Sequence, residues 1–78
     1  MNDNVTTKLA AILTTLAETG GAPESIIYLG VNSNLDEWAR LKYVLMDNGL
    51  CSIVFDYMTL TDKGLKLAKQ IEAAIKGV

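Results

Sequence analysis

The sequence contains no histidine and a single cysteine among its 78 residues. Without histidine, the chain lacks the side chain that most often performs acid–base catalysis near neutral pH, and a frequent protein ligand of zinc. Cys51 by itself forms neither an internal disulfide nor a zinc site, and the sequence offers no base that would activate it. We therefore predict that Cys51 is a small buried hydrophobic residue, and that the chain has no catalytic residues, binds no metal or cofactor and is not an enzyme.

The sequence also lacks an excess of positive charge. It has seven lysine and arginine residues against nine aspartate and glutamate residues, which gives a net charge of −2. A nucleic-acid-binding domain usually carries a basic surface, so DNA binding by this chain would depend on local clustering of its few cations.

Two targeting features are absent as well: a positively charged segment at the N-terminus, and an apolar run long enough to cross a membrane. We therefore expect a cytoplasmic protein that does not contact a membrane. The length fits one domain over residues 1–78, and half of the residues are hydrophobic, which is enough for a compact core. A domain of this size buries only about 60% of its unfolded surface, so a second copy could cover the apolar surface that remains.

Glycine and proline divide the first part of the chain. Apolar residues recur with helical spacing over about residues 5–19 and predict a first helix, which Gly20-Gly21 ends. Pro23 suits the first turn of a short second helix, predicted over about residues 23–29.

A third helix is predicted to follow Asn34. This asparagine and Glu37, three residues later, form an asparagine version of the capping box, and Asn48-Gly49 is a strong helix stop. The apolar side of this helix is predicted to carry Leu35, Trp38, Leu41 and Leu45.

The segment over residues 50–60 predicts a β-hairpin. A two-residue connection at Asp56-Tyr57 pairs Phe55 with Met58 and places the large apolar side chains on one face, because strand side chains alternate. We therefore expect Phe55 to pack in the core, where its truncation would be costly. The predicted inner face consists of Cys51, Ile53, Phe55, Met58 and Leu60.

A fourth helix is predicted to begin at Thr61, which can cap it. Gly64 lies inside this helix and costs about 1 kcal/mol relative to alanine, so a close approach of another backbone is expected there. The apolar face carries Gly64, Leu67, Ala68, Ile71, Ala74 and Ile75, and the opposite side carries Lys63, Lys66, Lys69 and Lys76.

Two segments resemble a known family. The stretch "LTDKGLKLAKQI", which follows the hairpin, resembles the corresponding part of the winged-helix (winged helix-turn-helix) superfamily. The stretch "GAPESIIYLGVNSNLDEWARLKYVLMDNGL" is similar to the turn and recognition helix of small archaeal winged-helix chromatin proteins and their viral and plasmid relatives. The resemblance covers about residues 8–72 and implies a mostly α, α+β fold: a three-helix cluster, one short antiparallel hairpin and a C-terminal helix.

In winged-helix families the third helix enters the major groove of DNA and the wing contacts the backbone or the minor groove. The resemblance therefore implies that double-stranded DNA is a partner. The residues that it places toward the groove are Asn32, Ser33, Asn34, Asp36, Glu37, Arg40 and Tyr43, with Tyr57 and Thr59 in the wing.

The two cations of the third helix each have a structural alternative. Arg40 either reads a guanine edge or forms an ion pair with Asp36 or Glu37 on its own helix, and the ion pair is the favoured interpretation. Lys42 either contacts a phosphate or only solvates the helix.

The polar residues before the helix are open to the same question. Asn34 is better explained as a helix cap than as a base contact, and Ser33 can be a turn residue. Asn32 is the residue that turn and cap roles explain least. Tyr43 falls opposite Trp38 on the helix, so it is predicted to be exposed.

Two functions remain open. The first is a small DNA-binding or transcription-associated regulator, dimeric through its C-terminal helix, because two-fold proteins read two half-sites. The second is a winged-helix module that binds a protein and not DNA. Acidic residues at the start of the third helix, Asp36 and Glu37, favour the second function, and so does the absence of lysine and arginine between Tyr43 and Asp62.

Overall fold

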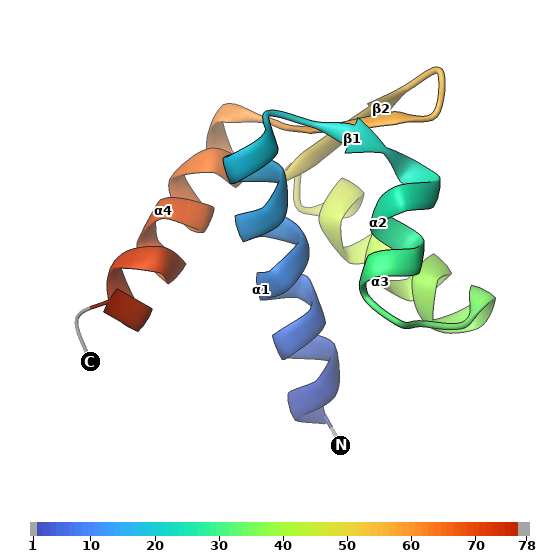
Figure 1. Cartoon of the computed structure of the whole chain (residues 1–78), viewed down its shortest axis with the longest axis horizontal. Helices are drawn as coiled ribbons and strands as arrows, with labels where there is room; N and C mark the ends of the chain where they lie inside the picture. The colour runs from blue at the N-terminus through green and yellow to red at the C-terminus, as the bar shows by residue number, and fades with distance from the viewer. Residues whose placement is uncertain (1, 77–78) are drawn as a thin grey trace.

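The computed structural model describes the backbone of residues 2–76 and the side chains of residues 5–76. The predicted fold class is confirmed: the chain has a mostly α, α+β fold that is winged-helix-like, with a three-helix cluster, a short antiparallel hairpin and a C-terminal helix (Figure 1). The elements are α1 (Asn2–Thr19), β1 (Ala22–Pro23), α2 (Glu24–Gly30), α3 (Leu35–Asp47), β2 (Cys51–Val54), β3 (Tyr57–Leu60) and α4 (Asp62–Lys76).

Helix α1 lies at the centre of the molecule. Figure 1 shows α4 on one side of it and α2 and α3 on the other, and α1 contacts both α3 and α4. The N-terminal end of α1 and the C-terminal end of α4 diverge, and the two helices come closest near the sheet.

The sheet contains one strand that the sequence did not predict. The two-residue strand β1 pairs with β3, which makes β3 the central strand in the order β1-β3-β2. Pro23 therefore belongs to β1 and precedes α2, instead of occupying the first turn of that helix. An edge strand accepts proline because it needs no donor on its outer side.

The core lies where α1, α3 and the hairpin meet. The apolar stripe predicted on α1 is confirmed by Ile12 and Leu16, which are fully covered. Cys51 is buried, as predicted. The remaining buried apolar residues are Leu13, Ile27, Trp38, Leu41, Leu45, Leu50, Met58 and Ala68.

The start of α3 confirms one prediction and overturns another. The Asn34 side chain accepts a hydrogen bond from the Glu37 backbone N–H at 2.8 Å, which is the predicted cap. Leu35, in contrast, is 74% exposed and does not join the apolar face. Trp38, one turn later, is buried in the core, whereas Leu35 lies outside the core.

The predicted hairpin turn is wrong. The connection is Phe55-Asp56, with both residues at positive φ (51° and 64°), as a two-residue type I′ turn requires. Ile53 pairs with Met58 instead of Leu60, a shift of two positions that keeps every strand residue on its predicted face. Phe55 leaves the inner face and is 98% exposed, so it is not a core residue.

The start of α4 agrees with the sequence. The Thr61 hydroxyl accepts from the Gly64 N–H at 3.1 Å and donates to the Gly49 carbonyl at 2.6 Å, so it caps α4 and ties it to the end of α3. The predicted close approach at Gly64 is confirmed, because a methyl group there would collide with the Leu50 carbonyl oxygen.

The register makes opposite predictions for two hairpin residues. Met58→Ala should lower the free energy of unfolding by about 2–5 kcal/mol, because Met58 is fully buried. Phe55→Ala should change it by less than about 0.5 kcal/mol, because the ring contacts solvent. Urea denaturation of the two variants checks both values, and a larger loss in Phe55→Ala than in Met58→Ala would refute the register.

Candidate functional site

The outer face of α3 presents three of the residues that the resemblance placed toward DNA: Asp36, Arg40 and Tyr43. Arg40 is exposed, and Tyr43 is 68% exposed, as its position opposite Trp38 predicted. Asp36 is exposed as well, and the same face also carries the exposed Met46. One cation therefore shares this face with a carboxylate and large apolar side chains.

The turn before α3 contains three of the residues that the resemblance placed toward DNA: Asn32, Ser33 and Asn34. Asn32 adopts a left-handed conformation with φ of 52°, and its carbonyl oxygen accepts from the Lys8 ammonium at 3.1 Å. Asparagine tolerates this backbone region better than most residues do, which explains its presence there. The Ser33 hydroxyl is buried and has no hydrogen-bond partner among the described residues, and Asn34 caps the helix. Of these three residues, only Asn32 is exposed and has a side chain that forms no hydrogen bond with the described residues.

Lys42 forms an ion pair with a residue of another helix. Its ammonium lies 2.7 Å from a Glu24 carboxylate oxygen, which also accepts from the Trp38 indole N–H at 2.8 Å. This ion pair joins α3 to the start of α2, a structural role that the sequence did not predict for Lys42. Hydrogen bonds from Lys42 and Trp38 lower the pKa of Glu24.

The predicted ion pair of Arg40 is also absent from the described side chains. Glu37 pairs instead with Lys8 of α1, at 2.6 Å. Sequence reasoning missed this pairing because the two residues lie 29 positions apart and only the packing of α1 against α3 brings them together. Arg40 is left outside both ion pairs that residues 5–76 form.

The hairpin tip is apolar and carries one charge, which is negative. Phe55 is its most exposed residue, and Val54 and Tyr57 beside it are also exposed. Tyr57 thus lies on the wing surface as the resemblance implied, whereas Thr59 is half-buried. Asp56 is exposed at the turn, where its backbone carbonyl accepts from the Glu24 N–H at 2.7 Å. The tip is therefore fixed against the start of α2.

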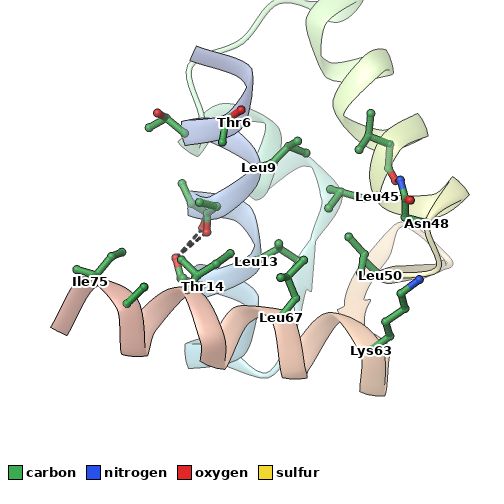
Figure 2. Close-up of a pocket in the computed structure, with 16 residues that line it drawn as sticks. Thr6, Leu9, Leu13, Thr14, Leu45, Asn48, Leu50, Lys63, Leu67 and Ile75 are labelled. Carbon is green, nitrogen blue, oxygen red and sulfur yellow. Dashed lines mark hydrogen bonds between the residues drawn. The ribbon is translucent and has the colours of Figure 1, made fainter. Parts of the chain in front are cut away.

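A long apolar groove of about 940 Å³ opens between α1, α4 and the C-terminal part of α3. Figure 2 shows Leu9 and Leu13 of α1 and Leu67 of α4 along this groove, with Leu45 of α3 facing them. Ile75 lies at its open end and is 65% exposed. Most of the apolar face predicted for α4 lies on the groove. The four lysines of α4 are exposed, but Lys63 also lines the groove and therefore does not lie on the opposite side as predicted.

Cys51 is the one cysteine of the sequence. Burial raises the pKa of the Cys51 thiol to about 11, so little reactive thiolate forms near neutral pH. Across residues 5–76 the acidic and cysteine side chains form no group of three that could hold a metal ion. Within residues 2–76, no helix combines the length and apolarity that crossing a membrane requires.

Comparison of this chain with protein-family models, with curated proteins and with solved structures finds no match.

The lowered pKa of Glu24 predicts a pH-dependent contribution to stability. Because the folded-state pKa lies below the usual 4.5, the stabilisation is complete above that value and disappears as the pH falls through the folded-state pKa. Glu24→Gln keeps an acceptor for Trp38 and loses the charge that holds Lys42. It should cost about 1 kcal/mol of unfolding free energy near neutral pH and close to nothing in strong acid.

Urea denaturation of the unaltered protein and of Glu24→Gln, near neutral pH and in strong acid, measures this difference in unfolding free energy. The exposed residue Asp47, which forms no ion pair among the described side chains, provides a control in Asp47→Asn. An equal loss for Glu24→Gln at both pH values would show that its charge does not stabilise the fold.

Proposed function

We propose that this protein is a small transcription-associated regulator of the winged-helix superfamily, and that its α3 and hairpin surface binds a protein partner. The order of helices and strands supports the family. The partner class is supported by the charge of the surface that winged-helix proteins commonly place on DNA.

One observation carries the choice of a protein over DNA. Of the three cations on α1 and α3, Lys8 is held by Glu37 and Lys42 by Glu24, which leaves Arg40. A DNA-binding surface must neutralise several phosphates with lysine or arginine, and each unpaired carboxylate opposes that.

The apolar content of the same side supports a protein partner. Exposed aromatic and aliphatic side chains are the usual anchors of protein interfaces, and Tyr43 of α3 and Phe55 of the hairpin are of this kind. The exposed large apolar residues of α2, α3 and the hairpin are Ile26, Leu29, Leu35, Tyr43, Met46, Val54, Phe55 and Tyr57.

Duplex DNA is the second candidate partner. Arg40 and Tyr43 favour it, because they lie one helical turn apart on the exposed face of the helix that reads DNA in this superfamily. Arginine can bind a guanine edge through two hydrogen bonds, and tyrosine can contact a phosphate.

A titration with random-sequence duplex DNA at low and moderate salt separates the two candidates. The proposed function predicts no binding that weakens with salt. A DNA reader would lose affinity steeply as salt rises, and Arg40→Ala would weaken its binding without lowering the melting temperature. Salt-sensitive binding that depends on Arg40 would refute the proposed function.

Site-specific photo-crosslinking supplies the positive evidence. A benzophenone side chain at position 43 should give a protein adduct in cells that express the protein, and the same group at position 69 on exposed α4 should not. Tyr43→Ala should abolish co-purification of the adduct partner. Equal adducts from both positions would indicate non-specific contact and count against the proposed surface.

We further propose that the protein is a homodimer through α4. The apolar groove between α1 and α4 supports this assembly, because the side chains that line it on α4 continue to the exposed end of the helix at Ile75. A two-fold arrangement would let the end of each α4 enter the groove of the other copy, since one patch then serves both partners.

Sedimentation across a range of concentrations tests the dimer. Ile75→Lys should shift the protein toward the monomer without unfolding it, because Ile75 is mostly exposed in the single chain. A control substitution on the lysine-bearing side, Lys69→Ala, should leave the assembly unchanged. A monomer at every concentration for the unaltered chain would exclude the dimer.

A further inference from the structure

A second hollow, of about 330 Å³, lies between the hairpin turn and the starts of α2 and α3. Tyr28, Leu35 and Trp38 supply its apolar surface, and two acidic residues, Glu24 and Asp56, also line it. Among the described residues that line it there is no lysine or arginine. The hollow thus combines aromatic and aliphatic surface with negative charge.

The two carboxylates differ in what already binds them. Glu24 is held by Lys42 and by the Trp38 indole N–H, so its charge is compensated inside the protein. Asp56 is exposed and forms no ion pair with the described side chains. Uncompensated negative charge therefore remains on the hairpin side of the hollow.

The backbone that carries Asp56 is anchored. Its carbonyl oxygen accepts from the Glu24 N–H at 2.7 Å, which ties the turn to α2. Tyr28 packs edge-on against Trp38, with ring centroids 5.9 Å apart and an interplanar angle of 69°. The aromatic rings and the backbone of the turn are thus held in place before any ligand arrives.

We propose that this hollow binds an arginine side chain of the partner protein, an inference that rests on the proposed protein-binding function. The guanidinium ion is planar, stacks on aromatic rings and matches a carboxylate with two hydrogen bonds. Its apolar stem would cover Leu35, which the fold leaves 74% exposed. Charge complementarity with Asp56 selects a cation over a neutral apolar residue.

Titration with a small peptide tests this assignment. The probe is N-acetyl-Gly-Arg-Gly-amide, and the matched control replaces arginine by citrulline, which has the same shape without the charge. Trp38 is the only tryptophan of the chain, so its indole N–H resonance reports on the hollow directly. We expect the arginine peptide to shift the signals of Trp38, Tyr28 and Asp56, and the citrulline peptide to bind about fivefold more weakly.

Two matched variants locate the charge that is responsible. Asp56→Asn removes the carboxylate and keeps a residue that tolerates the left-handed turn, so the fold should be retained. It should weaken the arginine peptide about fivefold and leave the citrulline peptide unchanged. Asp47→Asn removes an exposed carboxylate that does not border the hollow and should change neither affinity.

Several outcomes would overturn the inference. They are equal binding of the arginine and citrulline peptides, signal shifts elsewhere than the hollow, equal weakening by both variants, and no shift at any peptide concentration. A lysine peptide that binds more tightly than the arginine peptide would overturn the choice of arginine. These outcomes would refute the arginine site alone, because the photo-crosslinking at position 43 tests the protein-binding function independently. Salt-sensitive duplex binding would refute the proposed function itself.

Discussion

The fold depends on one strand, β3, being held from both sides against α1. It pairs with β2 along its length and with the two-residue strand β1, and its residue Met58 is fully buried between the sheet and the helices. Because strand side chains alternate, fixing Met58 inward also fixes which residues face solvent. The bond from the Glu24 N–H to the Asp56 carbonyl then places the hairpin tip beside α2. The hollow and the apolar tip both follow from this arrangement.

Internal ion pairs decide what kind of surface the protein offers. Lys8 and Lys42 could have made the surface around α3 basic, but each binds a glutamate of another helix. These pairs hold α1, α2 and α3 together and compensate the charges of two cations. The surface that remains is apolar, with Arg40 and several carboxylates, and such a surface is better suited to a protein than to the phosphates of DNA.

Much of the fold could be predicted from the sequence because its signals are local. Helical spacing of apolar residues, the Asn34 cap and the glycine stops gave the helices to within a few residues. The hairpin turn was misplaced because Phe55 is apolar and Phe-Asp is not a typical turn pair. Its actual position depends on contacts with β1 and α2, which lie more than thirty residues earlier in the chain. The exposure of Leu35 likewise depends on how Trp38 fills the edge of the core.

The amino-acid sequence by itself determined the helices and the caps of α3 and α4. It also determined the inward faces of the hairpin strands, the buried character of Cys51 and the close packing at Gly64, because each depends on neighbouring residues or on a simple periodicity. Only the tertiary structure decided the partners of Lys8, Glu24 and Lys42, the exposure of Phe55, and the hollow between α2, α3 and the turn. Those features require residues far apart in the chain to meet. The number of residues between two positions does not say how far apart they lie in the folded protein.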